Sequence, residues 1–100
     1  MARTRLDRAT VAQKLEALPD WAANGDFTTI ERSFRFADFS EAFGFMTRSA
    51  LAAEKLDHHP EWRNVYRTVD VTLSTHDAGG LTDLDFQLAA RMDAFAAGKH

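Results

Sequence analysis

Hydrophobic residues recur at helical spacing in three segments of the chain. In the first segment, Val11, Leu15 and Leu18 lie three or four residues apart, and a proline directly after Leu18 ends the helix that they predict. Asp7 or Thr10 can cap its start, because a short side chain with an oxygen atom accepts hydrogen bonds from the first turn.

The middle segment predicts a longer helix, from about 38 to 57. Asp38 followed three residues later by Glu41 is typical of a helix start. Its predicted core stripe consists of Phe39, Phe43, Met46, Ala50 and Ala53. Phe45 and Leu56 fall outside this stripe, so the helix carries more apolar surface than one face can bury. In so small a protein, the excess indicates a contact between subunits.

The last segment predicts a helix that begins after Thr82 and ends at Gly98. Its core face consists of Leu84, Leu88, Met92 and Phe95. Asp85 lies three residues after Thr82, so one role open to it is to complete a capping box at the start of this helix.

Alternating apolar and polar residues predict strands between the helices. A short strand from Trp21 enters an Asn24-Gly25 turn, and a longer strand follows over 27–36. The apolar face of the longer strand consists of Ile30, Phe34 and Phe36. Phe27 and Arg32 fall on the wrong faces, which we interpret as a frayed start or a bulge.

The segment 62–76 is also β-like, because Val69, Val71 and Leu73 alternate with polar residues. The pattern fits either one long strand or two short strands broken near Arg67. The element order α-β-β-α-β-β-α predicts an α+β fold, an antiparallel sheet with three helices on one face.

Length and composition predict one domain over residues 1–100 in the cytoplasm. The chain is 45% hydrophobic, which is enough for a core, and it has no cysteine for disulfides or thiolate zinc sites. The net charge of −3 argues against nonspecific binding to nucleic acid. No apolar run approaches the roughly 20 residues of a membrane span, and none follows the N-terminal bases as in a signal peptide.

Three internal histidines, His58, His59 and His76, are the candidates for acid–base chemistry, while we discount His100 as a terminal residue. Glu54 and Asp57 lie close enough in sequence to neighbour His58 at a helix C-terminus, where the protonated imidazole is favoured. The alternative for His58 is a surface C-cap. The alternative for His59 is packing, and for His76 an exposed place at a strand end.

A zinc site made from these histidines with Glu54 or Asp57 is chemically permissible. However, His59 precedes a proline and is expected to point away from His58, and adjacent histidines that point apart make poor co-ligands. The sequence therefore predicts no metal. It also lacks the glycine-rich phosphate-binding loops and the serine-hydrolase elbow.

Three motifs in the second half of the chain give it a family resemblance. Residues 54–66 read EKLDHHPEWRNVY, residues 69–77 read VDVTLSTHD, and GGLT at 79–82 is followed by Asp85. Together they resemble the pterin-4a-carbinolamine dehydratases, also known as dimerisation cofactors of a homeodomain transcription factor. Earlier residues, Leu18-Pro19 with Trp21 and Phe34 to Phe39, extend the resemblance over nearly the whole chain.

The resemblance implies a four-stranded antiparallel sheet, and dimers that extend the sheet and pair into tetramers through the long helix. It also implies dehydration of 4a-hydroxytetrahydropterin to quinonoid dihydropterin, which recycles tetrahydrobiopterin for aromatic amino-acid hydroxylases. No metal or bound cofactor is expected for this lyase reaction. A hydroxylase or a transcription factor is an expected protein partner.

The resemblance also implies roles for individual residues. His58 and His76 are the acid–base candidates, and His59 holds the pterin. Glu54, Asp57 and Asp85 set the orientation and charge of the imidazoles. The residues expected to line the substrate pocket are Asp57, His58, His59, Ser74, Thr75, His76 and Asp77.

The alternative function is a non-catalytic interaction module on the same fold, as a transcriptional coactivator or an assembly chaperone. Such a module has no need for three histidines accompanied by carboxylates. The histidine set therefore favours the enzyme.

Overall fold

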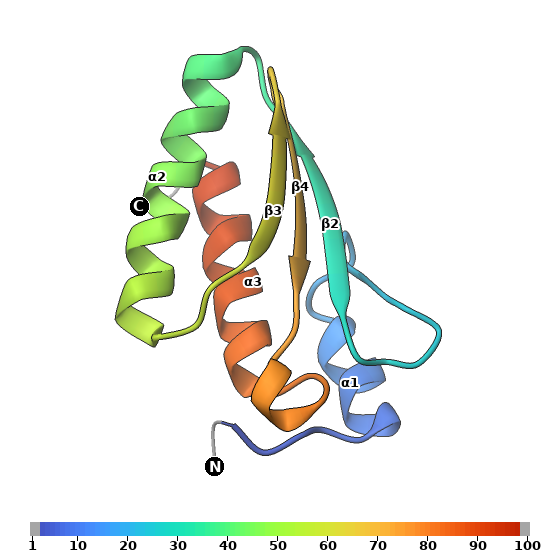
Figure 1. Cartoon of the computed structure of the whole chain (residues 1–100). Coiled ribbons are helices and arrows are strands. Elements are labelled where there is room, and N and C mark those ends of the chain that lie inside the picture. The colour runs from blue at the N-terminus through green and yellow to red at the C-terminus, as the bar shows by residue number, and fades with distance from the viewer. Residues whose placement is uncertain (1–2, 99–100) are drawn as a thin grey trace.

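Capping residues set the starts of all three helices. The computed structural model describes residues 3–98, so His100 lies outside it. The elements are α1 (Arg8–Leu15), β1 (Ala22–Ala23), β2 (Ile30–Arg35), α2 (Phe39–Leu56), β3 (Glu61–Val65), β4 (Thr68–Leu73), the 3-10 turn η1 (His76–Ala78) and α3 (Asp83–Ala96) (Figure 1). Asp7, Asp38 and Thr82 are the N-caps. Hydrogen bonds from Thr10, the backbone N–H above all, hold the pKa of the Asp7 carboxyl below its ordinary value.

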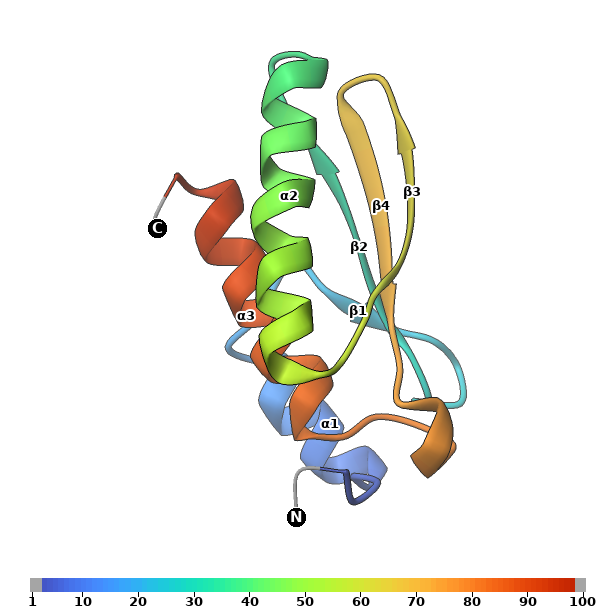
Figure 2. The ribbon, with the colours of Figure 1, turned by 60° about the vertical axis from the view of Figure 1, so that its left-hand side comes forward.

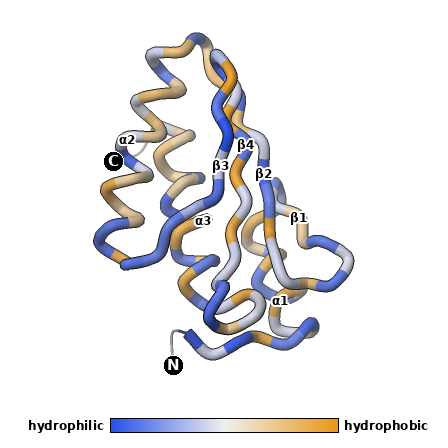
Figure 3. The backbone as a smooth tube through the Cα atoms, in the orientation of Figure 1, coloured by the Kyte–Doolittle hydropathy of each residue, from blue (hydrophilic) through white to orange (hydrophobic). Residues whose placement is uncertain are grey.

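The four strands form one antiparallel sheet, as predicted, and their order in it is β1-β2-β4-β3. Helices α2 and α3 cover one face of it, and α1 packs at its lower end (Figure 2). The β-like segment 62–76 is two strands, joined by a turn at Tyr66, whose φ is 52°. Hydrophobic and hydrophilic residues alternate along β4, so its apolar side chains face the helices (Figure 3).

The predicted core stripe of α2 is only partly right: Ala53 is buried and Met46 packs against the core, but the other three members are exposed. Phe45, predicted to lie off the stripe, is fully buried, whereas Phe39 and Phe43 are 48% and 55% exposed. The buried face of α2 consists of Ala42, Phe45, Ser49, Ala52 and Ala53. Small side chains on this face let α2 approach α3 and the sheet closely, and hydropathy alone does not register that advantage.

The first hairpin also differs from the prediction. Its connection is a loop over 24–29, in which the Asn24 side chain accepts N–H bonds from Thr28 and Thr29, instead of a two-residue Asn-Gly turn. Phe27 lies in this loop at φ 55°, and β2 begins at Ile30. This loop replaces the frayed strand start inferred from the sequence.

Arg32 lies on the helix-facing side of β2, where it forms an ion pair with Asp93 of α3. The Arg32 Nη1 donates to Asp93 Oδ1 at 2.6 Å, and Trp21 Nε1 donates to the same oxygen at 2.8 Å. A half-buried ion pair, and not a bulge, therefore accounts for a charged residue on the apolar face. Within residues 3–98, none of the helices is long and apolar enough to cross a membrane.

Candidate active site

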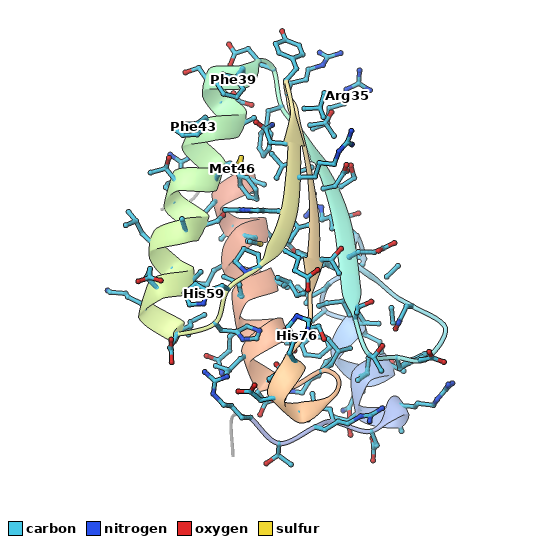
Figure 4. The ribbon with its side chains drawn as sticks, in the orientation of Figure 1. Arg35, Phe39, Phe43, Met46, His59 and His76 are labelled. Atoms are coloured by element: carbon cyan, nitrogen blue, oxygen red, sulfur yellow. The ribbon has the colours of Figure 1, made fainter. Side chains whose placement is uncertain are left out.

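A cavity of about 210 Å³ opens where the end of α2 meets the end of β4 and η1. Its lining consists of Arg3, Asp57, His58, His59, Ser74, Thr75, His76 and Asp77. The structure thus brings together all seven residues that were expected to line a substrate pocket, and adds Arg3. Figure 4 shows His59 and His76 at this end of the molecule, far from Phe39 at the start of α2.

The turn that ends α2 separates the two adjacent histidines. Asp57 is the C-cap in the left-handed region, at φ 50° and ψ 45°, and the His58 N–H then donates to the Ala53 carbonyl at 3.0 Å. This closure turns the His58 side chain inward, where it is 5% exposed. His59, extended before Pro60, stays on the surface.

Asp85 is the centre of a buried hydrogen-bond network. Its Oδ1 accepts from His58 Nε2 at 2.6 Å, and its Oδ2 accepts from the Thr82 N–H and the Thr75 hydroxyl, each at 2.9 Å. Because the Thr75 proton is used in this way, the Thr82 hydroxyl donates to Thr75 Oγ1 across their 2.8 Å contact. Asp85 therefore completes the predicted capping box of α3 and also holds His58.

This network fixes the state of the His58 ring. A carboxylate accepts hydrogen bonds, so the proton lies on Nε2, and Nδ1 is the nitrogen left to gain or lose a proton. The arrangement resembles in principle the acid–imidazole pairs that orient a histidine for proton transfer. Burial was not expected for His58, since the sequence placed none of the three histidines in the core.

Glu54 contacts His59, which corrects the expected pairing of Glu54 with His58. Its Oε1 lies 2.6 Å from His59 Nε2, and these side chains are 76% and 56% exposed. The four-residue spacing of Glu54 and His58 applies to a continuing helix, whereas the left-handed turn at Asp57 directs His58 to the core. Asp57 likewise points to solvent and contacts Arg3.

His76 has a carboxylate partner that the sequence analysis did not find. Glu61, the first residue of β3, places its Oε1 2.8 Å from His76 Nε2 on the surface. The register of β3 against β4 pairs Glu61 with Thr72, four residues before His76. Knowledge of this register would have placed Glu61 near His76. The sequence alone did not show whether 62–76 is one strand or two, so it gave no register.

Each of the three histidines thus has its own carboxylate. Among residues 3–98, no three histidine, aspartate or glutamate side chains converge where they could hold a metal ion. The arrangement is suited to proton transfer between a pocket ligand and the imidazoles, of which the buried His58 is held in one orientation.

Comparisons with known proteins agree with the resemblance. The family model described as pterin 4 alpha carbinolamine dehydratase matches residues 4–95. A protein of Chelativorans sp. (strain BNC1), provisionally named as a pterin-4-alpha-carbinolamine dehydratase, is 61% identical over 97 residues, which cover 97% of this chain and 99% of that protein. A protein of Rhizobium johnstonii with the same provisional name is 60% identical, over 97% of this chain and 96% of its own.

Two solved structures share the fold. A protein from Brucella melitensis, described as a transcriptional coactivator/pterin dehydratase, superposes with a TM-score of 0.90 at 52% identity, covering 93% of this chain and 99% of its own. A pterin dehydratase-like protein, described as a RuBisCO assembly factor in the alpha-carboxysome, gives a TM-score of 0.67 at 24% identity, over 81% of this chain and 93% of its own. The second likeness concerns the fold alone.

Proposed function

Because this chain belongs to the pterin 4 alpha carbinolamine dehydratase family, we propose that it is an active enzyme that converts 4a-hydroxytetrahydropterin to quinonoid dihydropterin and water. The observation that carries the proposal is the placement of His58, His59 and His76 around one cavity, each with a carboxylate on its Nε2. A module that only binds other proteins has no use for this arrangement.

The reaction needs two proton transfers. The C4a–O bond breaks and the hydroxyl leaves as water after it gains a proton from a general acid. A general base takes the proton from N5, and the electron pair of that N–H bond forms the C4a=N5 double bond. Atoms and charges balance without an oxidant, a reductant or a metal ion, so two imidazoles are sufficient.

We assign this acid–base pair to His58 and His76. The two lie in different environments, one buried against Asp85 and one exposed beside Glu61. Catalysis by one acid and one base requires one imidazole with its proton and the other without, so we expect a bell-shaped dependence of kcat/KM on pH.

His59 is assigned to binding of the pterin. Its ring lies on the rim of the cavity, held by Glu54 on the solvent side. We expect His59→Ala to raise KM by about tenfold and to leave kcat within a few-fold, because uniform binding energy is lost equally from ground state and transition state. Steady-state kinetics of the variant against the parent check this. A loss of kcat as large as the loss caused by His58→Ala would contradict the assignment of His59 to binding.

The dehydratase activity is tested in a coupled reaction. An aromatic amino-acid hydroxylase generates the 4a-hydroxytetrahydropterin, and the formation of quinonoid dihydropterin is followed with and without the chain. Acceleration above the spontaneous rate supports the proposal, and an unchanged rate overturns it. The hydroxylase is the proposed functional partner. We place both proteins in the cytoplasm, and we take residues 1–100 as a single domain.

A homo-oligomer through α2 forms part of the proposal. The exposed side of α2 carries Phe39, Phe43 and Leu51, and a cavity of about 290 Å³ lies between Phe43, Leu51 and Trp62 of β3. Figure 4 shows Phe39 and Phe43 on the first turns of α2, at the opposite end of the molecule from His76. An apolar surface of this kind is typical of an interface between subunits.

We expect Leu51→Glu to dissociate the oligomer, because a carboxylate placed in an apolar interface loses its hydration. Light scattering should give a mass that is a multiple of 11.2 kDa for the parent and 11.2 kDa for the variant. Gln87→Glu, which adds the same charge at an exposed position of α3, is the control. A parent that is monomeric at micromolar concentration overturns this prediction.

The alternative of a non-catalytic interaction module draws on the same apolar surface and on the coactivator description of the Brucella melitensis protein. A transcription factor is the partner it would predict. The two functions differ in what the histidines do, since binding through α2 does not involve the cavity. Substitutions at His58 and His76 therefore separate them.

A further inference from the structure

We propose that Arg3 is a substrate-positioning residue of the cavity, and that the N-terminal arm, residues 3–6, ties the two walls of the cavity together. The inference rests on the proposed function for the identity of the substrate, a pterin. Arg3 lies outside the motifs that carried the resemblance, so nothing in the sequence analysis singled it out.

Arg3 is bound to the wall that α2 contributes. Its Nη2 donates to the backbone carbonyl of Asp57 at 2.7 Å and lies 3.6 Å from the Asp57 carboxylate. The last carbonyls of a helix lack partners within the helix and carry a partial negative charge, which a guanidinium stabilises. Arg3 therefore holds the turn from which His58 and His59 extend.

The other end of the arm is bound next to the opposite wall. The Leu6 N–H donates to the Leu81 carbonyl at 2.8 Å, and Arg5 crosses the backbone at Gly80. A Cβ at Gly80 would lie 2.8 Å from Arg5 Nε, so the Arg5 side chain passes directly over this backbone position. Gly80 is paired with Thr75 of the cavity lining. Figure 1 shows the arm running beneath η1 towards the start of α1.

The charge of Arg3 suits a ligand with hydrogen-bond acceptors. Among the eight lining residues of the described chain, Arg3 has the only permanent positive charge, while Asp57 and Asp77 are acidic. Both contacts with Asp57 use Nη2, so Nη1 and Nε are not needed to hold the turn. A guanidinium donates through five N–H groups in a fixed plane. The carbonyl oxygen of a pterin and its ring nitrogens without a proton are acceptors for such N–H groups.

The test compares Arg3→Ala and Arg3→Lys with Arg8→Ala. Arg8→Ala is the matched control, because it removes the same charge from a position close to the arm. The Arg8 side chain contacts the Gly25 carbonyl and the Phe27 ring, away from the cavity. Two quantities are measured for each protein. The first is the Kd of a stable oxidised pterin, biopterin, from its fluorescence, and the second is kcat and KM for dehydration.

We expect Arg3→Ala to raise both Kd and KM by about tenfold, the effect of one lost charge-assisted hydrogen bond. kcat should change by less than about twofold, since the interaction is made equally in ground state and transition state. Arg3→Lys should recover part of the loss, because it keeps the charge without the planar fork. Arg8→Ala should match the parent.

The failures of the two proposals are distinguishable. If the parent binds biopterin and Arg3→Ala binds it equally well, the inference on Arg3 is wrong and the proposed function stands. A variant that loses thermal stability and kcat but keeps its Kd shows that Arg3 only holds the turn at Asp57, and overturns its role in positioning the substrate. A parent that neither binds biopterin nor accelerates dehydration removes the proposed function, and the inference with it.

Discussion

Replacing His58 by alanine is expected to lower kcat for dehydration by about 10²–10⁴-fold, the usual contribution of a positioned proton donor or acceptor. The His58 ring is buried and bound through Nε2 to Asp85, so its orientation is fixed before a substrate binds. His76→Ala is expected to have an effect of the same order. Stopped-flow kinetics measure both variants, after subtraction of the spontaneous rate.

Burial of His58 calls for a second variant that preserves the fold. His58→Gln keeps an N–H that can donate to Asp85 but cannot exchange a proton near neutral pH. We expect it to unfold close to the parent temperature and to be as slow as His58→Ala. If both His58 variants and His76→Ala dehydrate the pterin as fast as the parent, histidine catalysis is wrong.

Replacing Asp85 by alanine is expected to lower the free energy of unfolding by about 3 kcal/mol, because the capping box is broken and buried donors are left without an acceptor. Three donors lose their partner at once, namely His58 Nε2, the Thr82 N–H and the Thr75 hydroxyl. Urea unfolding followed by circular dichroism measures the change. We expect kcat to fall as well, because His58 loses the contact that fixes its ring.

Asp83→Ala is the control for this prediction. Asp83 lies in the same first turn of α3, but its contact with Lys14 is 3.2 Å long and both side chains are partly exposed. Exposed ion pairs contribute about 0–1 kcal/mol, so this variant should stay close to the parent. Equal losses for Asp83→Ala and Asp85→Ala would contradict a central role for the buried network.

The fold was predictable where its signals are local. The caps at Asp38 and Thr82 are written in three- and four-residue patterns, and they mark the helix starts that the structure has. The buried face of α2 was not predictable in this way. Two stripes of the helix compete for the core, and the choice of the one with Phe45 depends on how closely α3 and the sheet approach.

The site shows the same division between local and long-range signals. The motifs located the residues around the cavity, because the family resemblance implies which positions of the sequence line the substrate pocket. They gave Glu54 and Asp85 as supporting carboxylates but not the histidine that each one contacts, since the left-handed turn at Asp57 sends Glu54 to His59 and leaves His58 to Asp85. Glu61 and Arg3 reach the site through strand register and the N-terminal arm, which no local pattern encodes.

Single-turnover dehydration tests the central claim most directly. A 4a-hydroxytetrahydropterin generated in situ is mixed in a stopped-flow instrument with buffer, with the parent chain, or with a variant that lacks both His58 and His76. We predict that the parent speeds the loss of the 4a-hydroxy species in proportion to its concentration, and that the double variant leaves the spontaneous rate unchanged. A parent whose trace coincides with buffer would contradict the account and leave the interaction module in its place.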